Sequence, residues 1–421
     1  MKKTSVLAVL STLALATAAA TPAMAFENQF SGSFTSFFDL SNYSASGNWG
    51  GTDNLEGLKN NGDAQNYFVQ RVRLGYTAKA SESVKLVTKF ELDYNYYGNG
   101  SYDVNRGSGA GLGADSINIE TKNAYLDLSV TKSVNAKIGM MPYADAFKGV
   151  FFDADMAGVL LSHDYSNASI NAGFFRFKDS WTKTIGKNTN DMFALDGKYN
   201  LSKETKLGAA YYLIYDNTGT DARVHTLGVN GESAVGPLTL SGFALLQGRN
   251  HAAPGYTFNL GAKMPLAGGT ARAELLYAAG GKNALYVPAG NGGTETGYYN
   301  NEMIILGRDK NATTIDNAIV YDTNNYGQGV IFGSIGYDYT FSTKLSGSVN
   351  AGFATVAKDS TATKHESNYI GTEINCEANY KLLPEVTLGA RAGYVVLGDY
   401  FKGKGTDHNP YDIKLIASYS F

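Results

Sequence analysis

The last ten residues of the chain, Asp412–Phe421, alternate between two kinds of side chain and end on an aromatic residue. One set of alternate positions is apolar: Ile413, Leu415, Ala417, Tyr419 and Phe421. The other set is largely polar: Asp412, Lys414, Ile416, Ser418 and Ser420. Successive side chains of a strand point to opposite faces, so the segment predicts a strand with one apolar face. A closed barrel in lipid explains such an ending, because its last strand pairs with the first and its outer face is apolar.

The N-terminal residues 1–25 have the pattern of a secretory signal peptide. The pattern consists of a basic start, a run of small apolar residues and a small-x-small cleavage site, at Lys2-Lys3, Val6–Ala20 and Ala23-Met24-Ala25. The apolar run is shorter than the roughly 20 residues of a spanning helix. We expect residues 1–25 to be removed, and 26–421 to form one domain that begins at Phe26.

The composition favours membrane strands over membrane helices. After residue 25, no apolar stretch approaches the ~18 residues of a transmembrane helix. The 49 Gly among 421 residues amount to more than the usual share of roughly 7%. The 29 Tyr and 21 Phe fit the aromatic girdles of a membrane barrel. The net charge of −3 gives no indication of nucleic-acid binding. The single cysteine, Cys376, excludes an internal disulfide and a haem attached through C-x-x-C-H.

The hairpin Tyr67–Tyr94 indicates which face of the predicted sheet is in contact with water. Its even positions are mostly apolar, and its odd positions carry Arg71, Arg73, Lys85 and Lys89. A register slip of one residue would turn both arginines into lipid, at a cost of about 2–4 kcal/mol each near the midplane. The cationic side chains are therefore predicted to face the lumen.

Short turns and longer loops alternate along the whole chain. The predicted turns lie near residues 79–83, 131–135, 166–169, 201–205, 235–237, 265–269, 342–343 and 381–385. The predicted loops lie near residues 39–66, 96–117, 143–157, 179–190, 217–221, 249–255, 281–328, 357–367 and 399–411. These connections join 18 antiparallel strands, with short turns on one side as in membrane barrels. The count falls to 16 if the hairpin around residues 206–248 is misread. A soluble β-sandwich is the alternative, but it would need a large two-sided core.

The chain resembles the Gram-negative outer-membrane porins. The resemblance rests on the signal peptide, the terminal Phe421, the hairpin with Arg71 and Arg73, and the position of the third long loop. It implies that the final Phe is the signal read by the insertion machinery, that the barrel lies in the outer membrane, and that it forms a homotrimer. It also implies that the third loop folds inward and narrows the channel.

The third long loop, 143–157, contains phenylalanines beside acidic residues, whereas an outside loop is usually polar. The resemblance places its acidic residues opposite the basic wall. The candidate constriction then consists of Asp145, Lys148, Asp153 and Asp155 on the loop and Arg71, Arg73, Lys85 and Lys89 on the wall. Opposed charges across a narrow aqueous pore create a transverse field that filters solutes by charge. The alternative is that these acids only solvate an outside loop.

Several apparent motifs for catalysis, phosphate binding or metal binding lack the structural context that these functions need. Ser162-His163-Asp164 contains the residue types of a catalytic triad, but strand alternation turns His163 away from the other two. The glycines of 107–113 precede no helix, which argues against a phosphate cradle. Asp153-x-Asp155 and the stretch 309–325 could offer oxygen ligands to a hard cation, without EF-hand spacing. We therefore predict no catalytic residue, cofactor or metal site.

The sequence thus predicts an outer-membrane β-barrel that works as a passive diffusion channel for small hydrophilic solutes and ions. Three alternatives stay open. The channel could select an anion or a sugar. The barrel could be a sheath or scaffold for a partner such as an electron-carrying protein. Its long loops, above all 281–328, could bind partners outside the cell.

Overall fold

The computed structural model describes residues 27–45, 58–59, 64–96, 119–179, 188–217, 222–250, 252–288, 297, 299–310, 318–359, 364–403 and 408–421. The predicted signal peptide and the glycine-rich stretch 107–113 lie outside these residues.

One antiparallel sheet of 18 strands makes up nearly all of the described structure. Its strands are β1 (Glu27–Ser41), β4 (Gln65–Ser81), β5 (Val84–Tyr96), β6 (Glu120–Ser129), β7 (Val134–Ala144), β8 (Asp153–Asp164), β9 (Ala168–Asp179), β10 (Thr189–Asn200), β11 (Thr205–Asp216), β12 (Ala222–Val235), β13 (Leu238–Arg249), β14 (Ala252–Leu266), β15 (Gly269–Ala278), β18 (Val330–Thr340), β19 (Leu345–Thr355), β20 (Tyr369–Lys381), β21 (Val386–Leu397) and β22 (Tyr411–Ser420). The two-residue strands β2 (Ser44–Ala45), β3 (Leu58–Lys59), β16 (Asn300–Asn301) and β17 (Arg308–Asp309) lie in loops.

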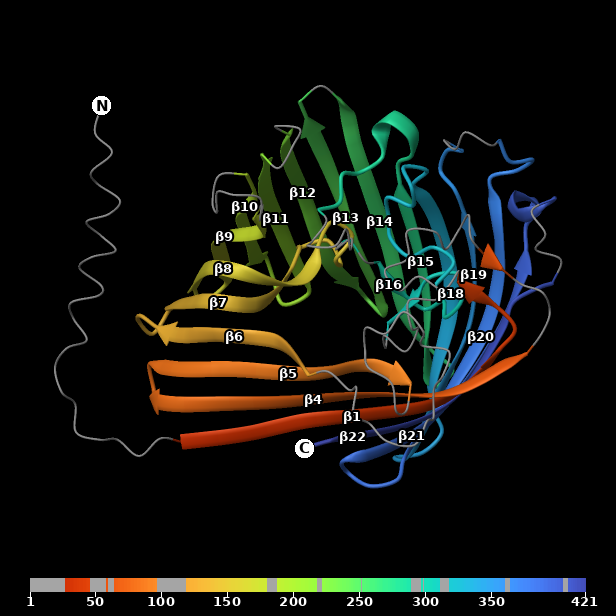
Figure 1. Cartoon of the computed structure of the whole chain (residues 1–421), viewed down its shortest axis with the longest axis horizontal. Coiled ribbons are helices and arrows are strands. Elements are labelled where there is room, and N and C mark those ends of the chain that lie inside the picture. Colours follow the sequence, from red (N-terminus) through yellow and green to blue (C-terminus); the bar gives the residue numbers. More distant parts are fainter. Residues whose placement is uncertain are drawn as a thin grey trace.

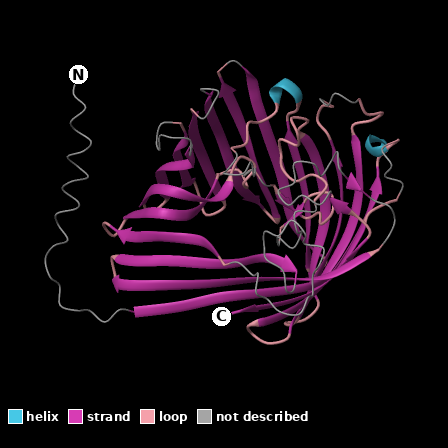
Figure 2. Cartoon of the chain, in the orientation of Figure 1, coloured by secondary structure: helices cyan, strands magenta, loops and turns pink. Residues whose placement is uncertain are grey.

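The sheet closes into a barrel. Each strand pairs with the strands before and after it, and β1 pairs with both β4 and β22 (Figures 1 and 2). The count of 18 is confirmed over 16, because the region 206–248 forms the paired strands β11, β12 and β13. All eight predicted short turns also join strands where expected. In the described part of the chain, two short 3₁₀ helices, Gly281–Asn283 and Asp399–Phe401, occur in loops. Among the described residues, no helix has the length and apolar character needed to span a membrane.

The C-terminal strand has the two predicted faces. Leu415 is 57% exposed on the outer face, whereas Lys414 is buried on the inner face. The last residue continues the pairing with β1: the N–H of Gly32 donates to the Phe421 carbonyl at 3.0 Å, and the N–H of Phe421 donates back at 3.1 Å. A Cβ at Gly32 would come within 2.6 Å of the Phe421 ring, so glycine makes room for it. The terminal aromatic therefore helps to close the barrel.

The third loop is shorter than predicted. The prediction of a loop over 143–157 is wrong at both ends, since β7 runs to Ala144 and β8 begins at Asp153. The ends of these two strands pair only with each other. β6 accompanies β7 only as far as Met140, and β9 accompanies β8 only from Ala157. The hairpin therefore continues as a two-stranded arm beyond the strands on either side of it.

Candidate functional site

The loop at the end of this arm, 145–152, packs inside the barrel. Its side chains Phe147, Phe151 and Phe152 are completely buried. The ring of Phe147 lies 5.8 Å from that of Phe243 on β13, and the ring of Phe152 lies 5.0 Å from that of Tyr212 on β11. Figure 1 shows the end of the β7–β8 hairpin in yellow, turned toward the middle of the molecule. The aromatic residues in this loop therefore pack against the inner wall of β11 and β13.

Asp145 organises the backbone of the loop. Its side chain is 7% exposed, and its two carboxylate oxygens accept four backbone N–H groups. The donors are Phe147 at 2.6 Å, Gly149 at 3.0 Å, and Phe151 and Phe152 at 2.7 Å each. Burial raises the pKa of Asp145 to about 6, while the four N–H donors act in the opposite direction. The group is thus ionised at neutral pH, and it turns into the loop rather than toward the channel.

Polar contacts fix the tip of the loop to β15, to β12 and to the long loop between β15 and β18. The ammonium of Lys148, a residue with a positive φ of 64°, pairs with the carboxylate of Glu274 on β15. Asn230 on β12 donates to the carbonyl of Ala146 at 2.8 Å. The hydroxyl of Thr323 donates to the carbonyl of Val150 at 2.8 Å. The loop therefore bridges the lumen from β7–β8 to β15.

A charge cluster lies where the arm faces the wall of β4, β5 and β6. Glu91 on β5 hydrogen bonds to Arg73, and it lies 3.8 Å from Arg71 and 3.6 Å from Lys122. Lys122 in turn lies 2.7 Å from Asp155 on β8. The structure therefore brings two predicted wall arginines and one predicted acid together through Glu91 and Lys122, which the sequence analysis did not select.

The other predicted residues lie at different distances from this cluster. The charges that act on Lys89 include those of Arg73, Lys122, Glu91 and Asp155, so Lys89 is close to the cluster. Asp153 interacts electrostatically with Arg308, a loop cation that the sequence analysis also missed. Lys85 stands four residues before Lys89, at the short-turn end of β5 opposite Lys79. At about 3.3 Å per residue this puts Lys85 some 13 Å from Lys89 along the strand.

The long loop between β15 and β18, 279–329, also lies partly inside the barrel. Its residues Ile304, Ile305 and Leu306 are buried, and their backbone N–H groups donate to the carboxylate of Glu373 on β20 at 2.7, 3.1 and 2.7 Å. The sequence predicts that 281–328 is an outside loop, and this prediction is wrong for residues 304–306. The apolar run at 303–306 was the signal that could have indicated otherwise, because such a run rarely stays in water.

No other chemical site forms among the residues that the structure describes. The hydroxyl of Ser162 donates to Asn171 at 2.7 Å, while the ring of His163 lies against Tyr165 with centroids 4.1 Å apart. No cluster of three His, Cys, Asp or Glu side chains suited to a metal ion occurs in the described ranges. The stretch 311–317 of the candidate cation segment lies outside them.

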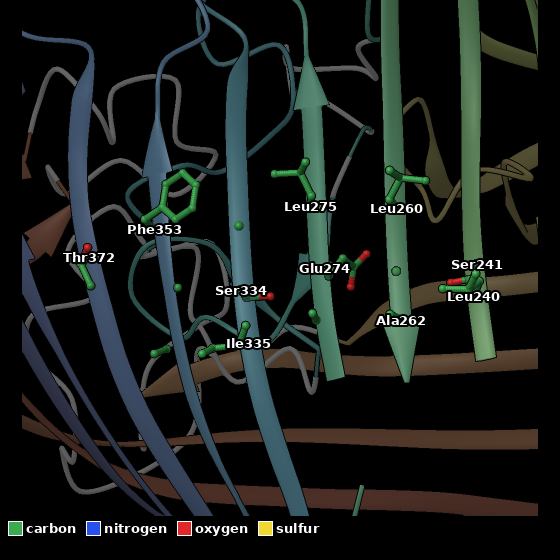
Figure 3. Close-up of a pocket in the computed structure, with 15 residues that line it drawn as sticks. Leu240, Ser241, Leu260, Ala262, Glu274, Leu275, Ser334, Ile335, Phe353 and Thr372 are labelled. Atoms are coloured by element: carbon green, nitrogen blue, oxygen red, sulfur yellow. The ribbon is translucent and has the colours of Figure 1, made fainter. Parts of the chain in front are cut away.

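A cavity of about 820 Å³ lies on the wall of β13 to β20 (Figure 3). Its rim is formed by exposed apolar side chains on the outer face: Leu240, Leu260, Leu275, Ile335 and Phe353. These residues are on the strand face opposite the charged lumen residues, so this groove is separate from the channel.

Comparison with solved structures places the fold among known proteins. No protein-family model and no curated protein matches the sequence. The solved structures of Pseudomonas aeruginosa OpdL, the P. aeruginosa outer membrane protein OpdK and Acinetobacter baumannii OccAB4 are similar, each at 13% identity. Their TM-scores are 0.59, 0.54 and 0.56. The matches cover 94%, 93% and 93% of this chain, and 99%, 98% and 98% of the others. The chain therefore has the 18-stranded fold of outer-membrane porins.

Proposed function

We propose that the protein is an outer-membrane porin, a passive aqueous channel for small hydrophilic solutes and ions. A barrel of this strand number encloses a lumen too wide for wall side chains to fill. The observation that carries the proposal is the third loop, 145–152, which extends from β7–β8 to Glu274 on β15 and so narrows the lumen. In the proposal, the narrow passage runs beside the charge cluster where the arm faces the wall of β4 to β6. Selectivity in such a channel comes from the groups that narrow it.

The proposal gives the predicted constriction residues two kinds of role. Arg71, Arg73 and Lys89 would act on solutes from the wall, with Asp153 and Asp155 on the arm. Asp145 and Lys148 would act by holding the loop in place, since both are engaged in contacts of the loop itself. Lys85 would affect the entrance at the short-turn end rather than the narrow passage. These roles rest on contacts that the charged groups make with one another.

An anion-selective channel is the second candidate, and one observation favours it. Among the described residues around the passage, cations outnumber carboxylates, five to four. The cations are Arg71, Arg73, Lys89, Lys122 and Arg308, and the carboxylates are Glu91, Glu120, Asp153 and Asp155. A net positive field raises the local concentration of anions. The two inward loops argue against a sheath for an electron-carrying protein, because they occupy space that such a partner would need.

The proposal also includes the localisation and the oligomeric state of the protein. Residues 1–25 would direct export and be removed, and the barrel would lie in the outer membrane. A homotrimer follows from the resemblance to porins, and the exposed apolar outer face supports contact with lipid or with further copies. The cleavage is tested by N-terminal sequencing of the protein from membranes, which should begin at Phe26.

Liposome swelling tests passive diffusion directly. Vesicles that contain the purified barrel should swell in neutral sugars at rates that fall steeply as the sugar grows. The control is that the purified barrel stays folded in detergent without heating. If vesicles with this folded barrel do not swell, the proposal is overturned.

The reversal potential across a KCl gradient tests the second candidate. We expect a preference for chloride that falls by up to about fivefold in the variant Arg73→Gln, the factor that ~1 kcal/mol of charge interaction gives. Lys85→Gln is the matched control, since it removes the same charge at the short-turn end of the wall. Equal effects of the two variants, or a cation preference in the unaltered protein, would reject anion selection by this passage.

A further inference from the structure

A second polar cavity, about 230 Å³ in volume, lies on the inner side of the wall near the tip of the third loop. Its charged lining comprises three cations and three carboxylates: Lys148, Lys263, Arg272, Glu232, Glu274 and Glu302. The remaining lining consists of small residues, with hydroxyls from Thr239, Ser241 and Ser334. The cavity therefore carries both signs of charge in equal number.

Three strands and two loops supply these charges. Arg272 and Glu274 are two residues apart on β15 and so share its inner face, and Lys263 of β14 is paired in register with Arg272. Glu232 stands on β12, on the face opposite the exposed Leu227. Lys148 comes from the third loop and Glu302 from the long loop 279–329.

The ions of the two loops already pair with the ions of the wall. Lys148 is bonded to Glu274, and a carboxylate oxygen of Glu302 lies 3.0 Å from Arg272. The other oxygen of Glu302 lies 2.7 Å from Lys310. Arg272 is further held by Asp338, through two bonds of 2.7 Å. The cavity is thus a preformed, ordered set of opposite charges rather than a cluster of one sign.

We propose that this cavity is a subsite for a small zwitterion, with an α-amino acid as the class of ligand. The inference rests on the proposed channel function and names a solute class for it. The volume of about 230 Å³ equals that of about eight waters at ~30 Å³ each, which suits a small amino acid. The carboxylate of the solute would meet Lys263 and Arg272, and its ammonium would meet Glu232 and Glu274.

Solutes of other charge types fit the lining less well. A simple anion would meet three carboxylates, and a simple cation would meet three cationic side chains. A neutral solute would displace water from these side chains without supplying an opposite charge. Binding is weak, because the solute competes with ion pairs that already exist. Weak binding is what a conducting channel requires, since a tightly held solute would not leave.

The experiment is saturation-transfer NMR on the full barrel in detergent micelles, which reports binding without conduction. The probes are alanine, propionate, ethylammonium and propionamide. Alanine carries both charges, propionate only the negative charge, ethylammonium only the positive charge, and propionamide neither. The variants are Lys263→Gln and Glu232→Gln, both at exposed positions of strands. Lys344→Gln is the control, because Lys344 lies in the short turn between β18 and β19.

We expect a signal for alanine that exceeds the signals of the three analogues. Each cavity variant should weaken it about two- to fivefold, as the loss of one solvated ion contact does, and the control should leave it unchanged. Equal signals from alanine and propionamide, or an alanine affinity in both cavity variants that is unchanged from the unaltered protein, would overturn the subsite. Single-channel recording separates the two proposals: conductance without alanine binding rejects the subsite alone, and alanine binding without conductance rejects the channel alone.

Discussion

At the residue scale, two buried carboxylates hold the two inward loops by the same means. Asp145 accepts four N–H groups of its own loop, and Glu373 on β20 accepts three from 304–306. Bonds from N–H groups to an ionised carboxylate are charge-assisted and stronger than neutral ones. A buried N–H left without an acceptor costs about 1–3 kcal/mol. A single carboxylate can therefore determine the conformation of a whole loop.

The variant Asp145→Ala should release the third loop while the sheet remains. Several buried N–H groups would lose their acceptor at about 1–3 kcal/mol each, which exceeds what the aromatic contacts of so short a loop can offset. We expect larger open-channel current noise and protease cleavage within 145–152. Circular dichroism should show an unchanged strand content. If the current noise stays unchanged and the loop resists protease, the packing of the phenylalanines alone is enough to hold the loop.

The sequence could not separate the three acids of the third loop. Asp145, Asp153 and Asp155 have the same residue type within one short segment, yet Asp145 faces inward into its own loop and Asp155 pairs with Lys122. The difference arises because β8 begins at Asp153, so the two later acids belong to the arm. Alternation in the sequence does not identify Lys122 as a lumen residue, because an irregularity in the register of β5 and β6 changes the alternation of faces there.

At the scale of elements, the third loop needs a gap in the part of the wall that it packs against. The ring of Phe147 lies directly over Gly228 on β12, where a Cβ would come within 2.4 Å of the ring. Neighbouring residues on the same face of the barrel are larger, such as Tyr212 on β11 and Phe243 on β13. Glycine at this position therefore lets the aromatic loop reach the wall.

The variant Gly228→Leu should displace the third loop from the wall. Overpacking of a filled core costs about 1–3 kcal/mol, and the loop can move more easily than the strand. We expect a changed single-channel conductance with little change in the unfolding temperature. Gly236→Leu would not be matched, because its φ is positive at 60°. Gly248→Leu is the suitable control, since a Cβ there meets nothing within 4 Å.

The strands of this chain could be predicted from the sequence, whereas the inward loops could be predicted only in part. The hairpin of β4 and β5 could be read from alternation, because one face meets lipid and the other water. The third loop could be selected by its phenylalanines. The long loop 279–329 was assigned to the outside, because its length and its Asn and Gly content resemble a solvated loop, and its contacts with β20 are remote in sequence.

At the scale of the whole molecule, the barrel depends on the seam between its first and last strands. Lys414 on β22 is directly opposite Asp39 on β1, and its ammonium lies 3.0 Å from that carboxylate. Lys414 also bonds to Asp412, and all three side chains are almost completely buried. Removing one member of a buried ion group leaves uncompensated charge, at a cost of about 3–5 kcal/mol.

The variant Lys414→Met should therefore weaken closure of the barrel. It leaves the carboxylates of Asp39 and Asp412 buried without their cation. We expect the temperature at which the barrel unfolds in detergent to fall, whereas Lys381→Met, at an exposed position, should have little effect. Equal unfolding temperatures for both variants would show that backbone pairing alone sets the stability of the seam.

The central claim is that the lumen is an open channel narrowed by the third loop. Single-channel conductance of the purified protein in a planar bilayer tests it most directly, with a variant in which 146–151 is replaced by a short glycine-serine linker. The account predicts stable current steps proportional to salt concentration, and larger steps in the variant. Steps of equal size would contradict the narrowing, and a folded barrel that conducts no ions would contradict the channel itself.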